Sequence, residues 1–203
     1  SYPDPFEFSG IREYERTDPM KHINWKASAS TGKLMVNQHD STTSAEITVF
    51  LDVEDTAILK YEALVEESIR IVSSLCARLA KTKMEADVVS NGRDGETGEL
   101  LRYRLPAGAA QMQALNQKLA RLITGERNTV PIRELFRREK ISGGSGRTCI
   151  VVSKNRTQEL ERELAAAVKE GTGVLWVLPV LPKGRQEEEE TPRGVTVLRW
   201  EVG

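Results

Sequence analysis

The sequence is poor in the side chains on which several classes of protein depend. Only two cysteines and two histidines occur in 203 residues, and they lie far apart, so a structural zinc site is nearly excluded. Cys76 and Cys149 sit inside apolar runs, VSSLCARL and RTCIVV. Because free cysteines are among the most buried side chains, we expect two buried thiols in a reducing compartment and no disulfide.

A surplus of charge of one sign is also missing. Lysine and arginine number 29 against 30 aspartates and glutamates, the net charge is -1, and aromatic residues make up only 5%. Binding to nucleic acid needs a clustered basic excess, and base stacking needs an aromatic surface. The composition therefore predicts no nucleic-acid partner.

Long hydrophobic runs are absent as well. The sequence has no stretch of about 18 uninterrupted apolar residues, so no segment is predicted to span a bilayer, and no signal peptide is recognisable. The chain begins SYPDP, without methionine, which is compatible with a fragment of a longer protein. With 203 residues and 39% hydrophobic content, it can bury one full core.

From Ala45 onward the sequence alternates regularly between strand and helix patterns. Residues 45–52, AEITVFLD, become continuously apolar, as in a strand covered on both faces. Residues 84–91 and 99–106 flank the turn GRDGETG, so they should be antiparallel strands, with 99–106 at an edge. The other predicted strands are 147–153, 172–180 and 195–202, and the predicted helices are 58–81, 109–123, 132–139 and 157–170, the last capped by Thr157.

This order of elements predicts the fold class. We expect an α/β fold with a doubly wound, mostly parallel sheet, one antiparallel edge strand and helices on both faces, that is, a Rossmann-like three-layer sandwich. We divide the chain into an N-terminal arm, residues 1–44, which packs on the rest, and a main domain, residues 45–203.

The first predicted strand ends in a polar segment, LDVEDTA, at the edge where such sheets bind ligands. Asp52, Glu54 and Thr56 offer oxygen ligands that suit a hard cation such as magnesium. We favour a simpler interpretation, in which Asp55 or Thr56 caps the following helix. Lys154, which follows strand 147–153, should pair with Asp52 in place of a metal, so no cofactor is predicted.

Catalytic motifs are not found. SGGSGRT precedes a strand and has arginine in place of the P-loop lysine, so it does not predict nucleotide binding. G-x-S-x-G is absent, Cys149 is expected in mid-strand, and both histidines belong to the N-terminal arm. We therefore predict that the chain is not an enzyme, and a hydrolase ranks third among the hypotheses.

The least ordinary segment is GIREYERTDPMKHINWKASASTGKLMV, residues 10–36. If it begins extended, Arg12 and Tyr14 share a face. The Asp-Pro pair at 18–19 should start a short helix over residues 20–28, which Thr31-Gly32 ends, and residues 33–39 should again be extended.

In a purely structural interpretation, this segment is a clasp. Ile23 and Trp25 would pack on the main domain, while Arg12 would pair with Asp18.

The same segment closely resembles the hallmark of the domain of unknown function family 58, a bacterial and archaeal group. That hallmark runs approximately R-x-Y-x-x-G-D-x-x-R-x-I-x-W-K-x-S-A-R and is followed by a strand. Thr17, Lys21 and Ser30 depart from it, and Lys21 keeps the charge of the usual arginine but loses its bidentate pairing. The matching residues are Arg12, Tyr14, Asp18, Ile23, Trp25, Lys26, Ser28 and Ala29.

The resemblance implies a von Willebrand factor type A-like fold, in agreement with the order of strands and helices. It also implies two membrane helices ahead of this region, which would place the domain at the cytoplasmic face of the membrane. Members of the family are commonly encoded beside MoxR-type AAA+ ATPases, and a role as the membrane-tethered partner of such an ATPase is the usual supposition.

Two hypotheses of function follow from the resemblance. Type A domains that bind metal use D-x-S-x-S after the first strand; here Asp52 matches, while Glu54 and Thr56 replace the serines. A cation-dependent adhesion module with this degenerate site, holding magnesium, is the alternative hypothesis. The leading one is a non-catalytic protein-interaction domain, with a partner surface formed by Arg12, Tyr14, Asp18, Lys21, Trp25 and Lys26.

Overall fold

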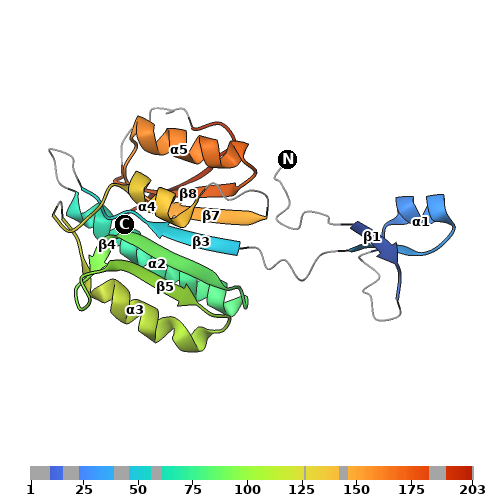
Figure 1. Cartoon of the computed structure of the whole chain (residues 1–203), viewed down its shortest axis with the longest axis horizontal. Coiled ribbons are helices and arrows are strands. Elements are labelled where there is room, and N and C mark those ends of the chain that lie inside the picture. The colour runs from blue at the N-terminus through green and yellow to red at the C-terminus, as the bar shows by residue number, and fades with distance from the viewer. Residues whose placement is uncertain are drawn as a thin grey trace. The chain divides into compact units, whose positions relative to one another are not determined.

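The chain consists of two compact units, Ser1–Ala45 and Glu46–Gly203, and each is described by itself (Figure 1). The computed structural model describes residues 10–15, 23–38, 46–55, 61–125, 127–141, 146–182 and 191–202.

In its described residues, the N-terminal unit combines a pair of strands with a short helix. β1 (Gly10–Glu13) runs antiparallel to β2 (Met35–Gln38). Ile23 forms an isolated bridge with Val36, and these two apolar side chains are 7% and 1% exposed. Among the described residues, they form the small core of this unit.

The helix of this unit, α1 (Trp25–Thr31), begins later than residue 20, so the predicted start is wrong. The side chain of Asn24 caps the helix by accepting a hydrogen bond from the backbone N–H of Ala27 at 2.9 Å, and the bridge holds Ile23 extended. Gly32, at φ +70°, ends the helix in the left-handed conformation that glycine adopts without strain. The predicted end is confirmed.

The larger unit is built on one sheet with the strand order β5-β4-β3-β7-β8-β9. β5 is antiparallel to β4, and the other neighbours along this path are parallel. The prediction of a doubly wound, mostly parallel sheet with one antiparallel edge strand is therefore confirmed. The strands are β3 (Glu46–Leu51), β4 (Ala86–Asp94), β5 (Leu100–Leu105), β7 (Arg147–Val152), β8 (Gly173–Val180) and β9 (Thr196–Glu201).

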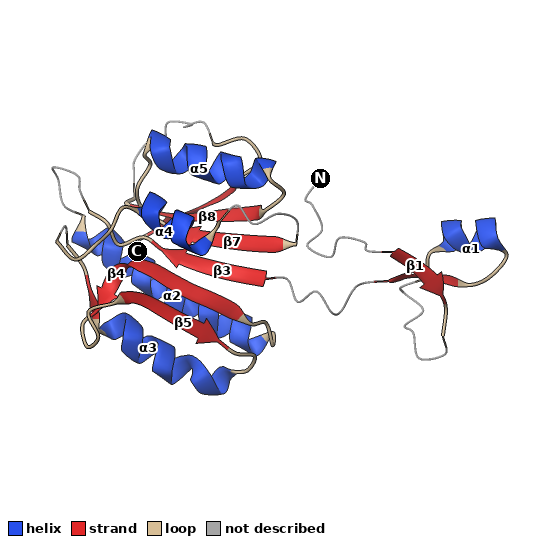
Figure 2. Cartoon of the chain, viewed as in Figure 1, coloured by secondary structure: helices blue, strands red, loops and turns tan. Residues whose placement is uncertain are grey.

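Helices cover both faces of this sheet (Figure 2). Val49 and Leu51 of β3 belong to the core layer under α2 and α3, whereas Phe50 belongs to the layer under α4 and α5. There the ring of Phe50 meets Phe136 edge-on, with 5.1 Å between centroids. Within the ranges given above, none of the helices has the length and apolar character of a bilayer-spanning segment. The helices are α2 (Glu62–Lys81), α3 (Met112–Ala120) with a preceding 3-10 turn η2 (Ala109–Gln111), α4 (Ile132–Glu139) and α5 (Gln158–Lys169).

In the larger unit, two predicted helix boundaries differ from the structure. The predicted helix 109–123 ends early, because β6 (Leu122–Ile123) pairs antiparallel with Arg93 and Asp94 at the end of β4. The helix predicted from residue 58 is described from Glu62 onward, and residues 58–60 lie outside the described ranges.

Both cysteines are free and buried, as predicted. Cys76 of α2 and Cys149 of β7 belong to different core layers. Burial raises the pKa of each thiol to about 12. Neither thiol is therefore a reactive thiolate at neutral pH.

Candidate functional site

β3 lies between β4 and β7 in the sheet, and doubly wound sheets bind ligands at the carboxyl ends of such strands. The buried carboxylate of Asp52, which follows β3, lies at the centre of this edge. Its Oδ1 accepts hydrogen bonds from Asn91 Nδ2 at 2.7 Å and from the backbone N–H of Glu54 at 3.1 Å. Its Oδ2 accepts from Ser153 Oγ at 2.6 Å and from Asn155 Nδ2 at 2.9 Å. Both carboxylate oxygens are thus bonded twice, and Asp52 is 1% exposed.

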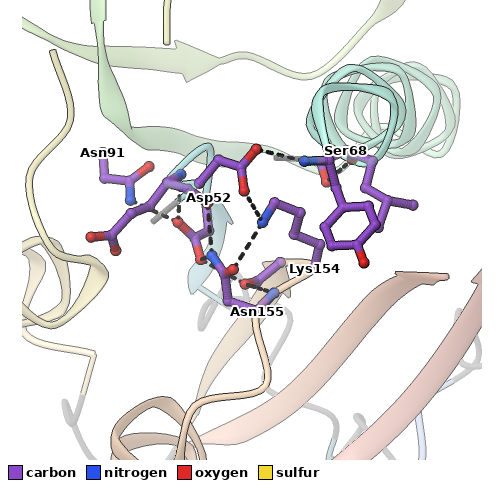
Figure 3. A network of polar contacts seen from close by, with 10 residues as sticks. Asp52, Ser68, Asn91, Lys154 and Asn155 are labelled. Carbon is purple, nitrogen blue, oxygen red and sulfur yellow. Dashed lines mark hydrogen bonds and ion pairs between the residues drawn. The ribbon is translucent and has the colours of Figure 1, made fainter. Parts of the chain in front are cut away.

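The two asparagines extend these contacts into a network, which we call the Asp52 network (Figure 3). Asn91 Oδ1 accepts from the backbone N–H of Val53 at 2.9 Å. Asn155 Nδ2 also donates to the carbonyl of Glu54 at 2.9 Å, and its Oδ1 accepts from Lys154 Nζ at 3.1 Å. Among the described residues, no buried side-chain nitrogen or oxygen lacks a hydrogen-bond partner. Every buried polar side-chain atom of the network is therefore bonded within the protein, and in this sense we call the network closed.

Lys154 forms its ion pair with Asp55, so the predicted pair with Asp52 is wrong. Lys154 Nζ lies 2.7 Å from Asp55 Oδ1, and the two side chains are only 4% and 10% exposed. Asp52 is already surrounded by neutral donors, which leaves Asp55 to balance the ammonium. Asp55 Oδ2 also accepts from the backbone N–H of Tyr61 at 2.8 Å. Tyr61 is the N-cap residue of α2, and no side chain caps this helix, so the predicted cap by Asp55 is wrong. Asp55 instead binds the backbone N–H of the N-cap residue.

Glu54 occupies the same edge but points its carboxylate to the start of α4. It accepts a hydrogen bond from the backbone N–H of Ile132, which favours the charged form. Burial opposes this most strongly, followed by the negative charge of Asp52, and together they raise the pKa of Glu54. Glu54 is thus a half-buried carboxylate whose charged form is disfavoured by burial and by the charge of Asp52.

These residues do not fit a divalent cation. The oxygens of Asp52 are occupied by protein donors, Glu54 is bonded to α4, and the Lys154 ammonium adds a positive charge beside Asp55. Thr56 lies outside the described residues. No group of three or more potential ligands is gathered anywhere in the ranges described.

An open pocket of about 670 Å³ adjoins this edge. Its charged lining residues are Asp55, Glu62, Glu66 and Arg127. Neither a thiol nor an imidazole lines it within the described ranges, so the pocket presents no cysteine or histidine for nucleophilic or general-base chemistry.

Asp52 and Lys154 were predicted from the sequence to lie at this edge, but the role of the two asparagines was not. Asn91 and Asn155 each follow a run of apolar strand residues closely, which is the signal that pointed to Asp52. An asparagine amide supplies both a donor and an acceptor, so it can join a carboxylate to backbone groups as these two do.

The predicted partner surface lies in the N-terminal unit. Arg12 and Tyr14 are half-buried while their neighbours Ile11, Glu13 and Glu15 are exposed, which confirms that Arg12 and Tyr14 share a face.

The other hallmark residues have mixed outcomes. Trp25 is 65% exposed, and Lys26 is exposed beside it. Ile23 is buried against Val36 of its own unit. Asp18, with its predicted ion pair, and Lys21 lie outside the described residues. Packing of Trp25 on the larger unit stays a prediction.

The sheet order defines the class of the larger unit. With the six strands of its main path ordered 3-2-1-4-5-6 along the chain and β5 antiparallel at the edge, it is a doubly wound α/β domain. The chain as a whole belongs to the DUF58 family, because the model described as "Protein of unknown function DUF58" matches residues 10–134, more than half of its length. The resemblance seen in residues 10–36 is thereby confirmed.

Two further comparisons add little to this assignment. The chain is similar to the crystal structure of the conserved hypothetical protein BatB from Bacteroides thetaiotaomicron, with 16% sequence identity and a TM-score of 0.48, covering 78% of this chain and 91% of that one. No curated protein matches it.

Proposed function

We propose that this chain is a non-catalytic protein-interaction domain of a membrane-anchored protein, and that its partner is a AAA+ ATPase of the MoxR type. The observation that carries the proposal is the closed Asp52 network. At the edge where doubly wound sheets bind ligands, the polar side chains are bonded to one another. Recognition through the surface is the function that such an arrangement supports best.

The N-terminal unit offers a surface suited to such recognition. Ile11, Trp25 and Leu34 are 43%, 65% and 47% exposed. Tryptophan is the residue most enriched among the few that dominate protein–protein binding energy. Trp25 does not belong to the buried pair of its own unit, and in this proposal its large side chain contacts the partner.

The test is binding of this chain to a purified MoxR-type ATPase from the same organism. We expect Trp25→Ala to weaken the affinity at least about tenfold, as for a hot-spot residue, without lowering the melting temperature, because this side chain is exposed. Leu181→Ala, in the larger unit and 41% exposed, is the matched control. Unchanged affinity in the Trp25 variant would remove Trp25 from the partner surface, and no binding by the wild type would overturn the choice of partner.

A further inference from the structure

Another pocket is lined by both α4 and α5, which cover the same face of the sheet (Figure 2). Its volume is about 260 Å³, below the roughly 300–1,000 Å³ of sites that hold whole small molecules. Phe136 and Ile141, 1% and 4% exposed, supply its apolar lining. The pocket therefore suits one side chain or chemical group better than a complete cofactor. Its charged lining residues are Arg133, Arg137, Lys140 and Glu163.

Two of the cations in this pocket are not neutralised within the protein. α4 carries three arginines, of which Arg133 pairs with Glu159 at 2.8 Å and Arg138 pairs with a glutamate of its own helix. Among the described residues, Arg137 and Lys140 have no ion-pair partner. Both are exposed, so the pocket presents two positive charges to an anion from outside.

Lys140 occupies a backbone position that usually selects glycine. It ends α4 in the left-handed conformation, at φ +50°, where a Cβ atom introduces strain. The turn itself serves the fold, because it lets the N–H of Ile141 donate to the carbonyl of Phe136 at 3.0 Å and returns Ile141 to the core. Glycine would make this turn without strain. A lysine here therefore indicates a use for its side chain.

We propose that this pocket binds one carboxylate side chain from an acidic segment of the chain's protein partner. The guanidinium of Arg137 offers a fork of N–H donors that matches the geometry of a carboxylate, and Lys140 adds a second positive charge. The inference rests on the proposed function, because it names the chemistry by which the larger unit recognises the partner.

The charge of the pocket favours a carboxylate over a phosphate. The charge of Arg133 is already balanced by Glu159. The remaining lining charges are those of Arg137, Lys140 and Glu163, two positive and one negative, which gives a net charge of +1. One carboxylate cancels this charge, whereas a phosphate monoester, at about −1.5 to −2, exceeds it. The carboxyl end of α4 adds partial negative charge, which disfavours the phosphate further.

Titration of the isotope-labelled chain with a blocked oligoglutamate peptide, followed by NMR, tests the ligand chemistry. We expect saturable amide shifts in α4, at residues 140–141 and around Glu163. Arg137→Glu should weaken binding about tenfold or more. Arg138→Glu, next in sequence but outside the pocket, should change it less than about twofold. Melting temperatures show whether each variant folds, and equal losses of affinity in the two variants would overturn the proposal.

Two other probes test the choice of a carboxylate. Inorganic phosphate and phosphatidylglycerol vesicles offer negative charge from different sources, and we expect both to cause weaker shifts than the peptide. Saturable shifts around Arg137 with either probe, in the absence of shifts with the peptide, would overturn the assignment.

A glycine substitution separates the lysine side chain from the turn that carries it. We expect Lys140→Gly to raise the melting temperature, because the strain is relieved, and to weaken peptide binding about threefold or more. The matched control is Lys83→Gly. Lys83, at φ +59°, is the other non-glycine residue with positive φ in the ranges described, and it does not line the pocket. This control should also raise the melting temperature but leave binding unchanged. Unchanged binding by Lys140→Gly would contradict the proposal.

The purified ATPase distinguishes this inference from the proposed function. We expect Arg137→Glu to weaken binding of the ATPase and Arg138→Glu to leave it unchanged. Binding that depends on Trp25 and not on Arg137 would overturn the inference and leave the proposed function intact. A wild-type chain that binds the peptide at Arg137 but does not bind the ATPase would overturn the choice of partner and support the chemistry of the pocket.

Discussion

Lys154 is a buried cation whose contribution to stability depends on Asp55. We expect Lys154→Met to destabilise the protein by about 3–5 kcal/mol, because removing one partner of a buried ion pair leaves the other charge uncompensated. Chemical denaturation at pH 7 measures this change.

The exposed pair of Lys33 with Glu13 supplies a matched control. Its atoms lie 3.1 Å apart, but its side chains are 64% and 63% exposed, so Lys33→Met should cost less than about 1 kcal/mol. Adding Asp55→Asn to Lys154→Met should recover part of the loss, since it removes the uncompensated charge. Equal, small losses of stability in both lysine variants would show that the buried pair contributes no more to stability than the exposed pair.

Glu54 should make stability depend on pH in the direction opposite to that of an ordinary paired carboxylate. Its folded-state pKa is raised above 4.5, first by burial and then by Asp52, so the folded protein holds this proton more tightly than the unfolded chain. The stabilisation is present below pH 4.5 and is lost as the pH rises through the folded-state pKa. We therefore expect Glu54→Gln to be more stable than wild type at pH 7, and the difference to disappear near pH 4.

Urea unfolding at several pH values measures this difference. The glutamine side chain keeps an oxygen that can accept the bond from Ile132, so the substitution removes mainly the charge. Because Glu54 is only half-buried, solvent screens part of this effect, and the gain should be small. A variant that is less stable than wild type at pH 7 would show that the hydrogen bond to α4 outweighs burial.

At the scale of the elements, local patterns predicted most of the larger unit. The bounds of α4 are those expected from the sequence, because Pro131 precedes its first residue and Leu135 with Phe136 supplies its apolar face. Thr157 caps α5 as predicted, with its Oγ1 3.2 Å from the backbone nitrogen of Leu160. In each case the determining residues lie within a few positions of the element.

Elements determined by distant residues were missed. Leu122 and Ile123 continue a helical pattern, yet they form β6 because the end of β4, far earlier in the chain, offers them backbone partners. In the N-terminal unit, the bridge of Ile23 to Val36 moves the helix start to Asn24. Backbone pairing across the fold overrides local propensity at such places.

The candidate site shows the same limit. Strand ends locate Asp52 and Lys154 at one edge from the sequence alone. The choice of partner depends on register: Leu51 stands beside Ser90 and beside Val152, which brings Asn91 and Ser153 to Asp52 before Lys154 can reach it. The partners of Asp52 depend on the registers of β3 with β4 and of β3 with β7. The spacing of residues within one segment contains no information on either register.

At the scale of the whole molecule, the Asp52 network connects three segments that are far apart in the chain. Residues 52–55, Asn91 and residues 153–155 come together only when β3, β4 and β7 are paired. The network is therefore a product of the complete sheet, and it should be lost in the same cooperative transition as the core.

Titration with magnesium separates the interaction domain from the alternative of a cation-dependent adhesion module. A site with a Kd of about 0.1 mM would stabilise the folded protein by about 2.7 kcal/mol at about 10 mM magnesium. For a protein of this size, that corresponds to a rise of roughly 5–11 °C in melting temperature. We expect no such rise, because protein donors already bind both carboxylate oxygens of Asp52. The positive charge of Lys154 also repels a magnesium ion. Asp52→Ala, which destroys the only carboxylate matching the type A motif, is the control. A dose-dependent rise in wild type that Asp52→Ala abolishes would establish the metal site and replace the closed network as the basis of function.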